Sequence, residues 1–167
     1  RGGEQATNGK VYINGTDIFA MNDDELAIFR RRQVGIIYQF YNLIPILNVE
    51  ENMAIPMELD GRKVEKAQMD DMLLRLGLTE RRTHLPNELS GGQQQRTSIG
   101  RALITRPSIV LADEPTGNLD TKASNEIMHL LKTSNRELNQ TIIMITHNME
   151  LAKAADRTIM IEDGKIR

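Results

Sequence analysis

The stretch that decides the fold is Ile109-Val110-Leu111-Ala112-Asp113-Glu114-Pro115, residues 109–115. Its first four residues are apolar in succession rather than in alternation, which is typical of a strand covered on both faces. Two carboxylates follow where the strand ends, and open α/β sheets bind ligands at the carboxyl ends of their strands. A metal ion or a phosphate-bound cation would explain these charges, because unpaired charges there are costly. The alternative is an acidic turn that simply reaches solvent.

Three similar runs extend the pattern along the chain. They are Val34-Gly35-Ile36-Ile37-Tyr38, Ile142-Ile143-Met144-Ile145 and Thr158-Ile159-Met160-Ile161. Helical patterns lie between the runs: apolar residues recur at helical spacing after Asp120, a suitable N-cap, and a shorter helix is expected over residues 151–155. Strands that alternate with helices predict an α/β protein with a parallel sheet and crossover helices.

Residues 42–105 contain no convincing strand. The pattern is helical over residues 49–59, where Pro56 is expected to break it, and again over residues 63–76, where Gly77 is the predicted stop. We therefore predict a helical subdomain, residues 42–105, inserted into an α/β core made of residues 1–41 and 106–167.

Two short elements are predicted before the core. The runs on either side of Asn14-Gly15 favour a β-hairpin over residues 10–18. Residues 23–32 favour a helix that ends in Arg30-Arg31-Arg32, which we interpret as a solvated face. The polar segment ahead of the hairpin has no start methionine, and we expect the N-terminus to be truncated.

A second motif is Leu89-Ser90-Gly91-Gly92-Gln93-Gln94-Gln95-Arg96, residues 89–96. Ser90 is a good N-cap, and the glycines let a ligand approach the backbone amides at the positive end of a helix dipole. The spacing of Ile99, Ala102 and Leu103 supports a helix that continues to about Arg106-Pro107. The motif therefore predicts a phosphate-binding helix start.

Polar residues also end two other apolar runs. Gln39 follows the first, and Thr146-His147 follows the third. A single Gln or His in such a place is more often structural than functional. If the three strands are neighbours, however, an amide, a carboxylate pair and an imidazole converge on one crevice, as in a phosphoryl-transfer site.

Taken together, these motifs resemble the nucleotide-binding domain of ATP-binding-cassette (ABC) transporters over nearly the whole chain. Leu89 to Gln93 resemble its signature motif, and Ile109 to Asp113 resemble its Walker B strand. Gln39 resembles the Q-loop glutamine, Gly117-Asn118-Leu119-Asp120 the D-loop, and His147 the switch histidine. The flanking residues are similar to those of lipoprotein-releasing, macrolide-exporting and antimicrobial-peptide-exporting ATPases.

The resemblance implies a P-loop NTPase-like (RecA-like) fold, ATP and Mg²⁺ as cofactors, and a set of residue roles. Asp113, through water, and Gln39 would hold the metal, and Glu114 would orient the attacking water. His147 would reach the γ-phosphate. The signature residues and the D-loop would contact nucleotide: Ser90, Gly91, Gly92, Gln93 and Asp120.

One expected element is missing from the 167 residues, because no G-x-x-x-x-G-K-[ST] P-loop occurs among them. In the family this loop lies upstream of Gly2-Gly3, and its strand lies within the sheet, beside the strand that ends at His147. Without it we expect exposed strand edges and exposed apolar surface, so that these residues alone would be unstable or would associate.

In the complete family member, two subunits form a head-to-tail dimer, and each signature helix covers an ATP held by its partner. The resemblance thus implies an ATPase that drives export or extraction through a transmembrane permease at the inner face of the cell membrane. A non-transport ABC ATPase and an ATPase-inactive binding module remain alternatives. The substrate and its direction are not specified.

Composition limits the other options. The 167 residues carry a net charge of −2, which gives no electrostatic reason to expect a nucleic-acid partner. No cysteine is present, so disulfides and thiolate chemistry are excluded for these residues. No apolar run approaches a membrane span, so membrane association would have to come through a partner. The resemblance implies that the chain itself lies on the cytoplasmic side.

Overall fold

A three-stranded parallel sheet lies at the centre of the computed structural model, which describes residues 8–167. Its strands are β3 (Val34–Ile37), β4 (Ile109–Asp113) and β5 (Thr141–Ile145), in the order β3-β4-β5. Gly35 pairs with Val110, and Val110 pairs with Ile142. The predicted α/β class and parallel sheet are confirmed, and the three strands whose ends carry polar residues are neighbours.

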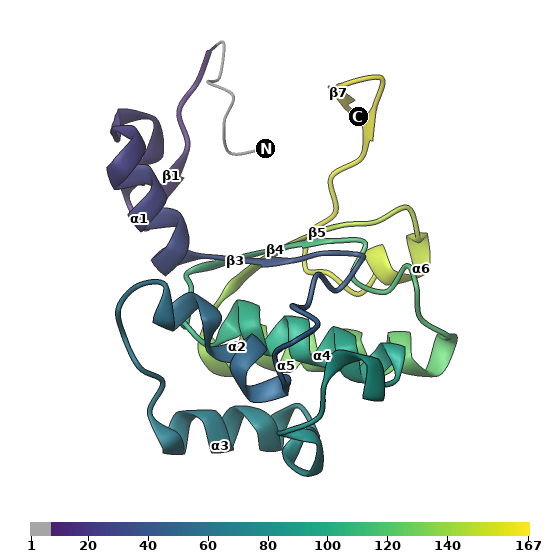
Figure 1. The fold of residues 1–167 in the computed structure, drawn as a ribbon. Helices are drawn as coiled ribbons and strands as arrows, with labels where there is room; N and C mark the ends of the chain where they lie inside the picture. The colour runs from purple at the N-terminus through teal and green to yellow at the C-terminus, as the bar shows by residue number, and fades with distance from the viewer. Residues whose placement is uncertain (1–7) are drawn as a thin grey trace.

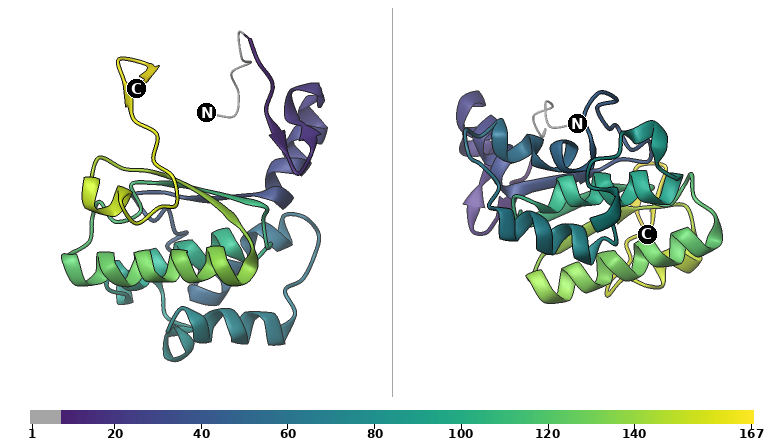
Figure 2. Two further views of the ribbon diagram at one scale, coloured as in Figure 1. Left: turned by 180° about the vertical axis from the view of Figure 1, so that it is seen from behind. Right: turned by 60° about the horizontal axis from the view of Figure 1, so that its bottom comes forward.

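Four helices lie on one face of this sheet (Figure 1). They are α2 (Val49–Glu58), α3 (Lys66–Arg75), α4 (Gly91–Leu103) and α5 (Thr121–Leu138). Helix α4 packs against β3, α2 and α5, while α3 lies farthest from the sheet (Figure 2). One cluster of buried apolar side chains joins these layers, including Ile37, Met53, Leu73, Ile99 and Ile127.

The opposite face of the sheet is open among the described residues. Ile36, Leu111 and Ile143 are 42%, 37% and 48% exposed, whereas their neighbours Ile37 and Val110 are fully buried. The expectation that these strands are covered on both faces is therefore wrong for residues 8–167. Continuous apolar runs do not reveal this, because a run has the same composition whether or not something covers its second face.

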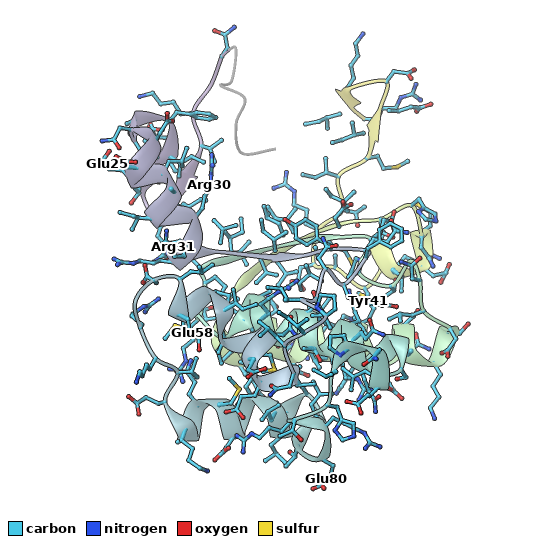
Figure 3. All side chains as sticks on the ribbon, in the orientation of Figure 1. Glu25, Arg30, Arg31, Tyr41, Glu58 and Glu80 are labelled. Atoms are coloured by element: carbon cyan, nitrogen blue, oxygen red, sulfur yellow. The ribbon has the colours of Figure 1, made fainter. Side chains whose placement is uncertain are left out.

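An N-terminal hairpin and one helix stand beside the sheet. Strands β1 (Tyr12–Ile13) and β2 (Thr16–Asp17) pair antiparallel around Asn14-Gly15, as predicted. The short helix η1 (Ile18–Ala20) and α1 (Asp23–Gln33) follow. The end of α1, where Figure 3 labels Arg31, is tied to the α2–α3 loop because the Asp60 carboxylate pairs with Arg31, Arg32 and Arg62.

Residues 42–105 contain helices and no strand. The expected break at Pro56 is wrong: α2 continues to Glu58, and the Leu59 amide still bonds the Ile55 carbonyl (2.9 Å). A proline this close to the end of a helix removes one backbone hydrogen bond, so the helix continues past it. The short helices η2 (Thr79–Arg81) and η3 (Pro86–Glu88) precede α4. The division into two subdomains stays a prediction.

The C-terminal part departs most from the predicted sheet. After α6 (Met149–Ala152), β6 (Ile161–Glu162) and β7 (Lys165–Ile166) form a separate antiparallel hairpin that rises away from the sheet (Figure 1). The prediction that residues 158–161 form a strand of the parallel sheet is wrong here. Asp163 and Gly164 have positive φ values of 51° and 74°, which suit a tight turn and favour this local pairing.

Candidate functional site

The carboxyl edge of the sheet gathers the polar residues that follow its three strands. Gln39 lies two residues beyond β3, Asp113 ends β4, and His147 lies two residues beyond β5. Because the strands are parallel and adjacent, their ends meet at the same edge (Figure 1). The expected convergence of these strand ends is confirmed.

Glu114 and His147 are in direct contact at this edge. Glu114 Oε1 lies 2.7 Å from His147 Nδ1 and accepts the His147 backbone amide at 2.8 Å. The Thr146 hydroxyl donates to Glu114 Oε2 at 3.1 Å. Glu114 has a φ of 43°, a left-handed conformation that is costly for a residue with a side chain. The strained backbone therefore aims the carboxylate at the neighbouring strand end.

Two opposing effects set the pKa of Glu114. Partial burial raises it, while hydrogen bonds from the His147 ring, the His147 amide and the Thr146 hydroxyl lower it. The hydrogen bonds prevail, so the pKa of Glu114 lies below its ordinary value. The carboxylate is therefore ionised at neutral pH, beside a histidine side chain that is 86% exposed.

Gln39 lies against the turn that follows Glu114. A Cβ atom placed on Gly117 would come within 2.9 Å of Gln39 Nε2, so any larger residue at this position would push the Gln39 side chain aside. The Asn118 side chain donates to the Gln39 carbonyl at 3.0 Å. The loops after β3 and β4 are thus joined at the residues predicted to be the Q-loop and the D-loop.

The predicted phosphate-binding helix start has the expected local geometry. Ser90 caps α4: its hydroxyl accepts the Gln93 amide (3.3 Å), and Gln93 Oε1 accepts the Ser90 amide (2.9 Å). The Gln93 side chain is therefore engaged by the cap. A Cβ atom on Gly91 would lie 2.9 Å from the hydroxyl of Tyr41, which Figure 3 labels. A larger residue at position 91 would therefore have to displace the Tyr41 ring.

A groove of about 450 Å³ lies between the starts of α4 and α5. Ser90, Gly91 and Gly92 line one side of it, and Asp120 lines the other. Asp120 caps α5 as predicted, by accepting the Ala123 amide at 2.8 Å. A larger groove of about 870 Å³ between α3 and α5 holds none of the predicted site residues.

The site therefore consists of two parts. The strand-end part holds Gln39, Asp113, Glu114 and His147, and the groove part holds Ser90, Gly91, Gly92 and Asp120. In the described residues, the Asp113 carboxylate is exposed and has no hydrogen bond or ion pair. No three His, Cys, Asp or Glu side chains of residues 8–167 group as a metal site.

Sequence reasoning missed the residues that hold these parts together. Gln95 is fully buried and bonds the strand ends, and Arg101 donates to the carbonyls of Tyr41 and Asn42. Thr146 was noted only as the neighbour of His147. The sequence does not distinguish a buried glutamine from its exposed neighbours at the polar start of a helix. Its hydrogen-bond partners are backbone carbonyls far away in the chain.

Comparisons with known proteins agree with this geometry. Residues 1–117 match the family described as ABC transporter. Over 163 residues the chain is 46% identical to the ABC transporter ATP-binding protein YtrE of Bacillus subtilis (strain 168), covering 96% of this chain and 71% of YtrE. It is 41% identical over 166 residues to the lipoprotein-releasing system ATP-binding protein LolD 1 of Chlorobium chlorochromatii (strain CaD3), covering 98% of this chain and 68% of that protein.

A solved structure is similar in fold. The dimeric ATP-binding cassette MJ0796, in a post-hydrolysis state bound to ADP and Pi, matches with a TM-score of 0.83 at 38% identity. The match covers 98% of this chain and 73% of that one. Within residues 8–167, no helix has both the length and the apolar character needed to cross a membrane.

Proposed function

The chain belongs to the ABC transporter family, and from this premise we propose that it is the ATP-binding and ATP-hydrolysing subunit of a transporter. The observation that carries the proposal is the contact between Glu114 and His147 at adjacent strand ends. It places an ionised carboxylate and an imidazole side by side, where open α/β sheets bind ligands.

Glu114 orients and polarises the attacking water. Its low pKa makes it a weak base but a good hydrogen-bond acceptor, which suits a reaction in which positioning and charge stabilisation supply most of the acceleration. His147 Nδ1 faces Glu114, so the exposed Nε2 is the ring atom that reaches the γ-phosphate.

Asp113 and Gln39 are the residues that would hold Mg²⁺. Carboxylate and amide oxygens are suitable ligands, and the Asp113 carboxylate has no competing partner within residues 8–167. Because these residues supply few ligands, phosphate oxygens and water must complete the coordination. A bound Mg²⁺ would supply positive charge that neutralises the charge developing on the phosphates.

The groove part acts on a nucleotide held by a second subunit. Ser90, Gly91, Gly92 and Gln93 form the helix N-terminus that contacts the nucleotide, and Asp120 borders the same groove. The amides of Ser90 and Gln93 are engaged in the helix cap, so Gly91 and Gly92 supply the amides for the ligand. These groups are too few for tight binding alone, but they complete a site whose other half is occupied. The dimeric state of the MJ0796 cassette supports a head-to-tail dimer.

A transmembrane permease is the second proposed partner, and it would keep the chain at the cytoplasmic face of the membrane. The loop after Gln39 exposes large apolar side chains, including Phe40 at 69% and Ile46 at 82%. Such side chains next to the Q-loop provide an apolar contact for a membrane subunit. The name of LolD 1, a lipoprotein-releasing system ATP-binding protein, supports export or extraction of a substrate.

The test is ATP hydrolysis by a protein in which a P-loop segment precedes residue 1, taken if needed from YtrE. We expect Mg²⁺-dependent phosphate release and ATP-dependent dimers, measured by a phosphate assay and by light scattering. Residues 1–167 alone serve as the control and should release little phosphate, because the main phosphate grip is not among them. Absence of both hydrolysis and dimers in the P-loop-containing protein would overturn the proposal.

A further inference from the structure

A buried glutamine connects the two parts of the site. Gln95 lies in the second turn of α4 and is fully buried. Its Nε2 donates to the Pro115 carbonyl at 2.7 Å and, more weakly, to the Tyr38 carbonyl at 3.4 Å. One side-chain amide therefore joins the helix that carries the groove glycines to the ends of both β3 and β4.

Both acceptors lie next to residues of the strand-end part. Pro115 directly follows Glu114, and Tyr38 directly precedes Gln39. The Pro115 carbonyl lies inside the turn closed by the Gly117 amide, which bonds the Glu114 carbonyl at 3.0 Å. Gln95 thus holds the backbone of the turn that gives Glu114 its left-handed conformation.

Packing alone does not explain an amide at this position. Gln95 Oε1 is buried and has no hydrogen-bond partner among the described residues. A buried acceptor without a partner is destabilising, and methionine would fill a similar volume without that cost. The benefit of the amide lies in the two carbonyls that it reaches.

We propose that Gln95 is a positioning residue that transmits engagement of the start of α4 to Glu114 and Gln39. The inference rests on the proposed ATPase function and extends it. Gln95 lies on the same helix as Gly91 and Gly92, so closure of the groove on a nucleotide would shift the three residues together. The amide then carries that shift to the turn at Glu114, where a displacement of about 1 Å affects rate strongly.

The chain offers a matched control. Gln140 is also buried, at 3% exposure, its Nε2 donates to the Pro107 carbonyl at 2.9 Å, and its Oε1 has no partner among the described residues. It lies at the opposite edge of the sheet, directly before β5. Both Gln95→Met and Gln140→Met remove a short side-chain bond to a proline carbonyl, and Gln95→Met also removes the longer bond to Tyr38. Only Gln95→Met loses a link to the site.

The experiment compares these two variants in the P-loop-containing protein. Without nucleotide, we expect Gln95→Met to speed hydrogen exchange in residues 38–41 and 114–117, and Gln140→Met to leave both segments unchanged. With ATP, Gln95→Met should lower kcat about tenfold or more, with KM changed less than about twofold, while Gln140→Met keeps normal turnover. A similar fall in Tm for both variants would show that the difference is not global stability.

Equal exchange and equal kcat in the two variants would overturn the positioning role. If Gln95→Met does not fold, the test uses NMR of the unmodified protein. Nucleotide should shift the signal of the Gln95 side-chain amide but not that of Gln140. Two unchanged signals would overturn the proposal. Lack of ATP hydrolysis by the unmodified protein would instead overturn the proposed ATPase function. Hydrogen exchange measured without nucleotide would still show whether Gln95 holds the turn at Glu114.

Discussion

The two edges of the central sheet are both polar, but their polar groups are used differently. The amino edge is the side of the sheet at which its strands begin. There, the Ser108 hydroxyl accepts the Asn14 side-chain amide at 2.6 Å and donates to Gln33 Oε1. Its backbone amide donates to the Gln33 carbonyl, and its carbonyl accepts the Thr141 amide. Most polar groups there are paired within the protein, although the buried Gln140 Oε1 has no partner among the described residues.

At the carboxyl edge the groups remain available. His147 is 86% exposed, the Asp113 carboxylate is unpaired among the described residues, and the amides at the start of α4 line an open groove. Glu114 is held in a left-handed conformation that costs about 1 kcal/mol or more. Backbone strain does not separate the two edges, because Arg106 and Asn139 at the amino edge also have positive φ values, of 52° and 50°. What distinguishes the carboxyl edge is that exposed polar groups there have no partner among the described residues, which leaves them available to a ligand.

The largest expected effect tests the carboxyl edge directly. Glu114→Gln keeps the size of the side chain but removes its charge, so phosphate release should fall about 100-fold or more, while ATP-dependent dimers persist. A phosphate assay and light scattering on the P-loop-containing protein measure the two results. Near-normal phosphate release would remove Glu114 from the catalytic role.

The second effect tests the groove. Ser90→Leu places a bulky side chain where the partner's nucleotide is proposed to lie, and ATP-dependent dimerisation should weaken about tenfold or more, with little change in ATP binding by the monomer. Asn48→Ala is the control, because it removes an equivalent helix cap from α2, away from the groove. Weaker monomer binding with normal dimerisation would contradict the assignment.

The third effect tests the amino edge. Ser108→Ala removes the hydroxyl that links Asn14 to Gln33, so the free energy of unfolding should fall by about 1 kcal/mol. Urea unfolding measures the loss, and the phosphate assay should show unchanged turnover. A large fall in kcat at equal stability would mean that the two edges are not separated in function.

The smallest effect concerns acid stability. The pKa of Glu114 is lower in the folded protein than in the unfolded chain, where it is about 4.3. The hydrogen bonds to the ionised carboxylate therefore stabilise the fold fully above that unfolded pKa. This stabilisation is lost as the pH falls through the folded-state pKa. The stability difference between the unmodified protein and Glu114→Gln should therefore be constant near pH 5 to 7 and shrink below about pH 4. Urea unfolding at several pH values tests this, and a difference that grows in acid would contradict it.

Much of the local structure could be predicted from the chain. Asp120 and Ser90 cap helices as expected, and Gly77 follows α3 with a φ of 64°. These features depend on a few neighbouring residues and their backbone preferences. The strand ends at Gln39, Asp113 and His147 also meet as predicted, because parallel neighbouring strands leave no other arrangement.

Other features depend on contacts between distant segments. The fourth apolar run has the composition of a strand, yet residues 158–160 join no sheet, and the hairpin turn at Asp163-Gly164 decides the pairing of Ile161. The sequence also did not reveal that the Tyr41 hydroxyl lies against Gly91.

The sequence by itself determined the parallel α/β order, the helix starts and the residues at the strand ends, because capping, turn chemistry and strand alternation act over a few neighbouring residues. Only the tertiary structure decided which face of the sheet is covered, that Glu114 contacts His147, and that Gln95 reaches Pro115. These depend on side chains from segments far apart in the chain meeting in one place, and no local pattern encodes such a meeting.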